Sequence, residues 1–187
     1  IKPRIPIYLE YFKKAGEEVK RVTQEMGIDW WDVSDYQALP DWKPCPAYEE
    51  NSVGYDLYPV PYKLPFHFFS VSTNNKWLNE LGEHHPSAYY IQINSQTAKS
   101  RGIKDEDLIR LETEKGTHVQ GRAKITEGVH PEVVGIAGTF GHWAKGLPTA
   151  KGKGVHFNTL ISADIEHIDM LSSAVDTCVK VKVTKIG

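Results

Sequence analysis

The chain begins with a stretch in which apolar side chains recur every three or four residues from Leu9 to Met26. Lysine and glutamate side chains occupy the other side of the same stretch. This spacing predicts an amphipathic helix with one packed face. Pro6 suits a position near its first turn, and Gly27 suits its stop.

The next segment, from Ile28 to Pro65, has no regular spacing of apolar positions. It carries most of the prolines and three tryptophans, Trp30, Trp31 and Trp42. Such a segment is too aromatic for a disordered linker, so we predict an extended arm that lies on another surface. Residues 1–65 are therefore expected to form a helix and an arm without a core of their own.

From Phe66 onward, short β-rich runs alternate with Gly, Asn and Asp turns. Six strands are predicted: Phe66–Val71, Tyr89–Ile93, Asp107–Thr113, His118–Ile125, Val133–Ile136 and Thr177–Val183. In the last of them, valines alternate with lysines, which is typical of a strand with one buried face. Lys115 and Gly116 are expected to form the turn of a hairpin.

Two short helices are predicted between the strands. One spans Asn75–Leu81 after a Thr73–Asn74 cap, and the other spans Ser95–Arg101 with Asn94 as its cap and Gly102 as its stop. Six short strands with two small helices favour a closed barrel, because closure removes exposed strand edges. We therefore predict a mainly β fold, with a β-barrel domain at residues 66–187 and short flanking helices.

Composition narrows the function classes. The formal net charge is −2 with both signs mixed, which argues against a nucleic-acid partner. No apolar run approaches the roughly 20 residues that span a bilayer, so we expect a soluble chain without membrane insertion. The sequence starts at Ile1 with no signal-like region, so its visible start is not expected to be the biological one, and cytoplasm and periplasm both stay open.

Metal and catalytic motifs are missing from the sequence. Cys45 and Cys178 lie far apart, and His84 and His85 are adjacent rather than spaced for zinc. There is no iron–sulfur motif, nucleophile elbow, phosphate-binding P-loop or dinucleotide glycine fingerprint. We predict neither a catalytic residue nor a metal ligand in this chain.

A polar turn precedes the first predicted short helix. It contains Ser72, Thr73, Asn74 and Asn75. The first N–H groups of a helix lack internal partners and favour negative charge, so this turn could receive a pyrophosphate. The same residues are also ordinary helix caps.

The second candidate segment runs from Ala137 to Asn158 and contains five glycines. His142 offers a ring donor, and Trp143 offers a flat face on which a planar heterocycle can stack. Long loops with their own aromatic residues are more often functional than idle.

The order of several short motifs resembles one family. They are Ile91–Asn94, Ala98, Arg101–Ile103, Asp107, Gly116, the Val119–Ile125 run, Gly141–Trp143 and Asn158. This order resembles the C-terminal molybdopterin dinucleotide-binding domain of the dimethyl sulfoxide reductase-type molybdopterin oxidoreductases. The resemblance covers roughly Ala38 to Val183 and is strongest from Leu64 onward.

The resemblance implies a double-psi β-barrel that binds molybdopterin guanine dinucleotide, in the bis form, carrying molybdenum or tungsten. It implies cofactor contacts from the polar turn, from the Gly-His-Trp motif at His142 and Trp143, and from the Asn158 amide. The redox chemistry would belong to other domains or subunits of a larger oxidoreductase, including an iron–sulfur electron-transfer component. The chain itself would supply binding, orientation and electrostatics.

Two positions depart from the family pattern. Asn74 and Asn75 stand where relatives commonly carry Gly-Arg, so a guanidinium contact to the phosphates is not expected. Asp164–Asp169 stands where relatives often have an Asp-Pro element.

Two other functions remain open at this point. A self-contained barrel hydrolase or lyase would use His142 or His85 as a general base and would need a convergent nucleophile or carboxylate. A non-enzymatic assembly module would bind a partner through the aromatic arm.

Overall fold

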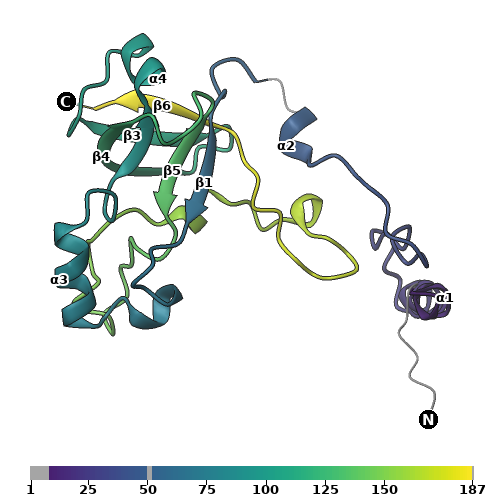
Figure 1. The fold of residues 1–187 in the computed structure, drawn as a ribbon. Coiled ribbons are helices and arrows are strands. Elements are labelled where there is room, and N and C mark those ends of the chain that lie inside the picture. Colours follow the sequence, from purple (N-terminus) through teal and green to yellow (C-terminus); the bar gives the residue numbers. More distant parts are fainter. Residues whose placement is uncertain (1–8, 50–51, 187) are drawn as a thin grey trace, which may run out of the picture. The chain divides into compact units, whose positions relative to one another are not determined.

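A computed structural model describes residues 9–49 and 52–186 (Figure 1). Pro6, expected near the start of the first helix, lies outside the described residues. The chain forms two compact units, residues Ile1–Pro46 with Ser162–Asp176 as unit 1 and residues Ala47–Ile161 with Thr177–Gly187 as unit 2. Within the described residues, no helix is long and apolar enough to cross a membrane.

Unit 1 is built around helix α1 (Tyr11–Glu25), which confirms the predicted amphipathic helix. Gly27 follows with a φ of 69°, the left-handed conformation expected of a helix stop. Gly16 allows the helix to approach Tyr36 closely, since an added Cβ would lie 2.5 Å from the Tyr36 Cβ. The unit also contains the short helix η3 (Ile165–His167).

Unit 2 contains a curled mixed sheet of six strands in the order β1-β5-β2-β4-β3-β6. The strands are β1 (Tyr58–Tyr62), β2 (Ile91–Asn94), β3 (Leu108–Thr113), β4 (His118–Thr126), β5 (Val133–Ala137) and β6 (Val181–Lys185). Strands β1 and β5, and β2 and β4, pair in parallel. Reciprocal hydrogen bonds between Leu57 and Val181 join the chain just before β1 to the edge strand β6.

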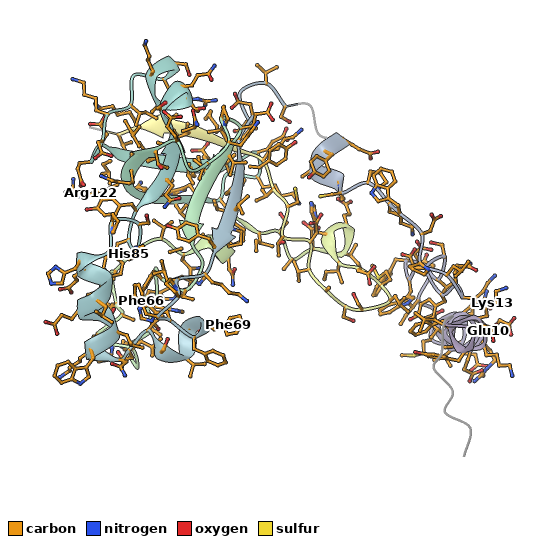
Figure 2. All side chains as sticks on the ribbon, viewed as in Figure 1. Glu10, Lys13, Phe66, Phe69, His85 and Arg122 are labelled. Atoms are coloured by element: carbon orange, nitrogen blue, oxygen red, sulfur yellow. The ribbon has the colours of Figure 1, made fainter. Side chains whose placement is uncertain are left out.

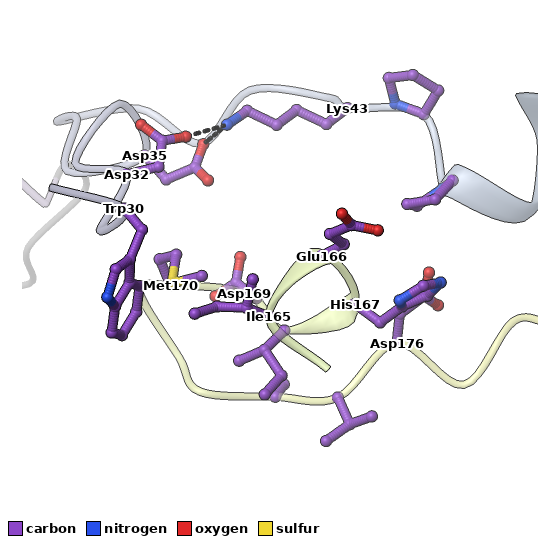
Figure 3. Close-up of a pocket in the computed structure, with 15 residues that line it drawn as sticks. Trp30, Asp32, Asp35, Lys43, Ile165, Glu166, His167, Asp169, Met170 and Asp176 are labelled. Atoms are coloured by element: carbon purple, nitrogen blue, oxygen red, sulfur yellow. Dashed lines mark ion pairs between the residues drawn. The ribbon is translucent and has the colours of Figure 1, made fainter. Parts of the chain in front are cut away.

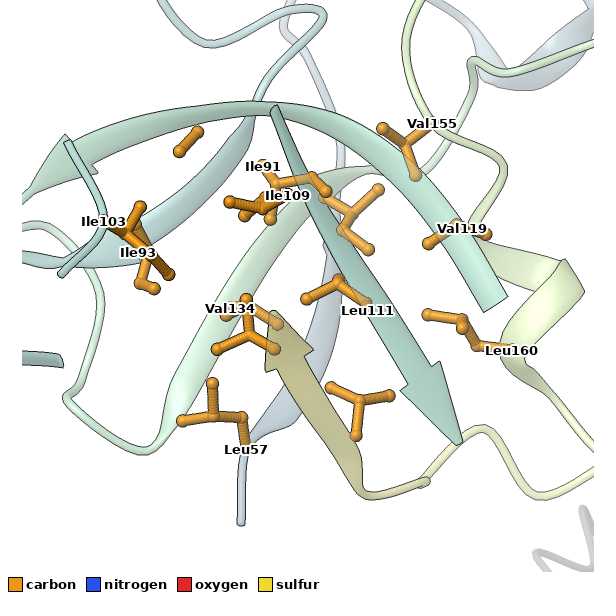
Figure 4. Packing of buried hydrophobic residues seen from close by; sticks show 14 of the residues in the cluster. Leu57, Ile91, Ile93, Ile103, Ile109, Leu111, Val119, Val134, Val155 and Leu160 are labelled. Carbon is orange, nitrogen blue, oxygen red and sulfur yellow. The ribbon is translucent and has the colours of Figure 1, made fainter. Parts of the chain in front are cut away.

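The remaining helices are α2 (Pro46–Glu49), η1 (Phe69–Ser72), α3 (Lys76–His84), α4 (Ser95–Ser100) and η2 (Phe157–Leu160). Helices α3 and η1 lie toward the C-terminal ends of β1 and β5, at the end of the sheet away from α4 (Figure 1). The core of unit 2 is the apolar inner face of the curled sheet, where Ile91, Ile109 and Leu111 are fully buried (Figure 4).

Several local predictions are confirmed. The β3–β4 hairpin turns at Gly116, where φ is 83°. Helix α4 has the Asn94 carboxamide as its cap, which accepts from the Gln96 N–H at 2.9 Å, and Gly102 follows it with a φ of 64°. Buried Val181 and Val183 alternate with more exposed neighbours, although β6 starts four residues later than the predicted strand.

The predicted strand Phe66–Val71 is wrong. The chain there forms the 3-10 helix η1, because the Ser72 hydroxyl accepts a hydrogen bond from the Phe68 N–H at 2.8 Å and closes a local turn. The first strand is instead β1, inside the segment expected to be an arm. Its Pro59 and Pro61 fit an edge strand, where one side of the backbone needs no ladder bonds. The predicted start of the β-domain at residue 66 therefore leaves out one strand of the sheet.

Candidate functional site

The polar turn, residues 67–75, connects the sheet to α3. The Ser72 hydroxyl accepts from the Phe68 N–H and lies 3.0 Å from the His67 Nδ1. Thr73 is fully buried, and its hydroxyl donates to the Ser70 carbonyl at 2.7 Å. The hydroxyls of Ser72 and Thr73 thus shape the turn from inside, and they do not face outward as expected for phosphate ligands.

Asn75 is the cap of α3, in place of the predicted Thr73–Asn74 cap. Its side-chain oxygen accepts from the Trp77 N–H at 3.0 Å and the Leu78 N–H at 3.3 Å. Asn75 therefore already accepts hydrogen bonds from two of the backbone N–H groups at the start of α3, and these two groups are not available to a phosphate.

Replacing Asn75 with alanine should lower the free energy of unfolding by about 1 kcal/mol, because the two N–H groups lose their acceptor. Asn75→Ser keeps a capping oxygen, so it should lower the free energy of unfolding by only about 0.3 kcal/mol. Chemical denaturation of both variants checks this expectation. Equal losses for the two variants would contradict the capping role.

Asn74 joins the polar turn to the second predicted segment. Its side-chain oxygen accepts from the Thr149 N–H at 2.9 Å across 75 residues of sequence. Thr149 lies in the glycine-rich loop, residues 138–158. A second contact of the glycine-rich loop is the ion pair of Lys153 with Glu83 on α3, at 2.5 Å. The two predicted segments therefore lie side by side at the C-terminal ends of β1 and β5.

His142 and Trp143 gather around a third ring in the glycine-rich loop, that of His156. The Trp143 ring lies edge-on to His156 with centroids 4.6 Å apart, and the His142 ring lies 5.8 Å from it. Trp143 is 66% exposed, so its indole is available to a planar ligand. The His142 Nε2 is buried and, within the described chain, has no hydrogen-bond partner.

Gly141 makes this arrangement possible. Its φ is 82°, and an added Cβ would lie 2.1 Å from the His156 backbone nitrogen. Only glycine allows the backbone at residue 141 to approach the backbone at residues 155 and 156 so closely.

Asn158 is exposed in η2, two residues after His156. The flanking Phe157 and Leu160 are almost fully buried and anchor this helix to the core. The structure thus brings Asn74, His142, Trp143 and Asn158 into two joined segments, whereas Ser72, Thr73 and Asn75 act within the turn.

The sequence interpretation missed His156, although a histidine between Gly154 and Asn158 in such a loop was a usable signal. Burial, and to a lesser extent His142, lowers the pKa of His156 below its ordinary value of 6.5. Its Nδ1 lies 3.0 Å from the Thr159 hydroxyl. The ring is therefore held neutral near pH 7.

This lowered pKa gives the sign of a pH effect. As the pH falls below 6.5, His156 takes up a proton in the unfolded chain more readily than in the folded chain. The free energy of unfolding is therefore unaffected by His156 above pH 6.5 and decreases as the pH falls below that value. His156→Asn, which keeps a polar atom facing Thr159, should therefore reduce the fall in melting temperature between about pH 6.5 and 5. Thermal unfolding across this range tests the effect, and parallel curves for variant and parent would refute it.

His85, which with His142 was considered as the general base of a rival enzyme, lies outside the glycine-rich loop. It follows α3, accepts from the Ser87 N–H at 3.3 Å and packs on Phe66 with centroids 5.5 Å apart. Figure 2 shows the Phe66 and His85 side chains near α3. These contacts give His85 a structural role.

A separate cavity of about 550 Å³ lies within unit 1 (Figure 3). Lys43 pairs there with Asp35 at 2.6 Å. Asp164, Glu166 and His167 form the one candidate metal-binding group found among the described residues, and two of its members are exposed carboxylates. None of the predicted site residues lines this cavity.

Comparisons with known proteins identify the family of the chain. The family described as "Molydopterin dinucleotide binding domain" matches residues 60–177. The molybdopterin-containing subunit ArrA of the arsenate respiratory reductase of Chrysiogenes arsenatis is 26% identical over 183 residues, which cover 88% of this chain and 21% of that protein.

Among solved structures, acetylene hydratase from Pelobacter acetylenicus superposes with a TM-score of 0.62 at 15% identity, over 88% of this chain and 22% of that chain. This likeness shows a shared fold. The chain spans about a fifth of the length of the relatives it matches. Because the family model matches most of its length, this chain belongs to the Molydopterin dinucleotide binding domain family.

Proposed function

We propose that this chain is the C-terminal cofactor-binding domain of a larger molybdenum- or tungsten-dependent oxidoreductase, and that its two joined loops hold molybdopterin guanine dinucleotide. The observation that carries the proposal is the contact of the polar turn with the glycine-rich loop through Asn74 and Thr149. The segments that match the family pattern meet at this contact.

The chemistry of the loops fits such a ligand. The buried His142 Nε2 lacks a partner among the described residues, and a buried polar atom in that state favours a ligand that supplies one. Exposed Trp143 offers a stacking face, and the exposed Asn158 amide offers donors and an acceptor to a heterocycle edge. We assign Asn74, His142, Trp143 and Asn158 to direct contact, and Ser72, Thr73 and Asn75 to the shape of the turn.

The finer features of the proposal follow from the resemblance. The cofactor in its bis form supplies the metal and its redox chemistry, and an iron–sulfur component of the larger enzyme exchanges electrons with it. The curled six-stranded sheet, whose edges meet at Leu57 and Val181, is compatible with a double-psi barrel. One relative is named a reductase and the other a hydratase, so the domain is expected to serve cofactor binding more than substrate choice.

Asn158→Ala should accelerate release of the dinucleotide from the full protein by roughly tenfold, because a lost hydrogen bond to a buried partner costs on the order of 1–3 kcal/mol. Lys99→Ala, an exposed change on α4, is the matched control and should leave release unchanged. Release is followed by the fluorescence of the oxidised pterin in the filtrate. Equal release rates for Asn158→Ala and the parent protein would remove Asn158 from the site.

A further inference from the structure

Each of the two joined segments contains one further buried polar side chain, His67 in the polar turn and Thr139 at the start of the glycine-rich loop. His67 is 8% exposed and Thr139 is 6% exposed. Among the described residues, neither the His67 Nε2 nor the Thr139 hydroxyl has a hydrogen-bond partner. A buried donor without a partner costs about 1–3 kcal/mol, so two together need an explanation.

Both residues flank the buried ring of Phe140. The His67 ring lies edge-on to it with centroids 5.0 Å apart, and Thr139 directly precedes it in the chain. Phe66 and Tyr89 pack against the same small apolar cluster. His67 and Thr139 thus lie at the base of the glycine-rich loop, at the C-terminal end of β5.

The hydrogen bonds of Ser72 indicate which nitrogen of His67 carries the proton. The Ser72 hydroxyl accepts from the Phe68 N–H, so its own proton is available to the His67 Nδ1 at 3.0 Å. With Nδ1 as the acceptor of that proton, we assign the ring proton to Nε2, which makes Nε2 a donor. Burial also lowers the pKa of His67, which keeps the ring uncharged.

An uncharged donor beside a hydroxyl in aromatic surroundings suits an uncharged heterocycle. The edge of a pterin or a guanine presents a carbonyl oxygen next to ring nitrogens, which these two groups can match. A phosphate would bury its charge there without a cation, which is costly.

Two of the contacts between the glycine-rich loop and the rest of unit 2 are weak. Asn74 and Thr149 share one hydrogen bond, and the Lys153–Glu83 pair lies at the surface. Gly146 and Gly152 have nothing within 4 Å of an added Cβ, so the loop is loosely packed at these two positions. A ligand would reach His67 and Thr139 by displacing these weakly held parts of the loop.

We propose that His67 and Thr139 form the floor of the cofactor site and hydrogen-bond the heterocycle edge of the dinucleotide. This inference rests on the proposed function, because it names two further binding residues of that same site. Neither residue takes part in a chemical step.

Thr139→Val in the full protein provides the decisive test, because valine keeps the shape and removes the hydroxyl. In the apoprotein the melting temperature should stay the same or rise, since the lost hydroxyl had no partner. In the holoprotein, release of the bound molybdopterin guanine dinucleotide should become about tenfold faster, as expected for one lost hydrogen bond. Thr97→Val is the control. Its equally buried hydroxyl donates to the Pro131 carbonyl at 2.5 Å, so it should lower the melting temperature and leave release unchanged.

A second pair of variants tests His67. Gln places an amide nitrogen near the position of Nε2, and Asn places one near Nδ1. His67→Gln should therefore retain the dinucleotide better than His67→Asn. Parent-like release in Thr139→Val, or a lower melting temperature of its apoprotein, would overturn the inference while Asn158→Ala still tests the proposed function. A parent protein that binds no dinucleotide would overturn both.

Discussion

Gly141→Ala should disrupt the glycine-rich loop more than any other single methyl group added there. The new Cβ would lie 2.1 Å from the His156 nitrogen and 2.4 Å from the Val155 carbonyl carbon, and backbone cannot move aside as a flexible side chain can. The residue would also keep a φ of 82°, which is strained for alanine. We expect a loss of roughly 2–4 kcal/mol in the free energy of unfolding, together with loss of dinucleotide retention.

Gly152→Ala is the matched control for this variant. Gly152 lies in the same loop with a φ of 76°, but nothing lies within 4 Å of an added Cβ. It should cost only the strain of the left-handed backbone, on the order of 1 kcal/mol. Denaturant unfolding of both variants separates the steric clash from the backbone strain. Similar losses in the free energy of unfolding for Gly141→Ala and Gly152→Ala would show that the Gly141 backbone does not approach His156 this closely.

Leu111→Ala should have an effect of similar or larger size on the sheet. Leu111 lies on β3 with no exposed surface, inside the main apolar cluster. Removing its side chain leaves a cavity in the inner face of the curled sheet, with an expected cost of about 2–5 kcal/mol. Leu108→Ala on the same strand should cost less than about 1 kcal/mol, because Leu108 is 43% exposed. If the two leucines cost the same, the assignment of the inner face would be wrong.

Much of the fold could be predicted because its signals are local. The β3–β4 hairpin depends on a glycine at a left-handed position, and α4 depends on Asn94 and Gly102 at its two ends. These features need only neighbouring residues. The family resemblance also rested on short motifs, and the matched region, residues 60–177, agrees with it.

The errors arose where distant contacts decide the structure. Pro59 and Pro61 argued for an arm, but β1 pairs with β5 and uses its proline-bearing side as a sheet edge. The Phe66–Val71 run has the composition of a strand, yet the Ser72 side chain turns it into a 3-10 helix. Composition did not reveal that a side-chain hydrogen bond would replace a strand ladder.

The candidate site was predictable in its parts and not in its arrangement. The polar turn and the glycine-rich loop were each identified by residue type. That Thr73 points inward, that Asn75 is occupied as a cap and that Asn74 reaches Thr149 depends on three-dimensional packing. Thr139 lies inside the predicted Ala137–Asn158 segment, but nothing in the sequence distinguished it or His67 as a binding residue, since a lone buried histidine or threonine is usually structural.

The most direct test of the central claim is the cofactor content of the purified full protein that carries this domain. Acid release followed by mass spectrometry should find guanine nucleotide and oxidised pterin in equal amounts, two of each per chain for the bis form. Elemental analysis should find molybdenum or tungsten in the same preparation. Fully folded protein that contains neither pterin nor guanine nucleotide, after expression in a host that makes the cofactor, would contradict the account.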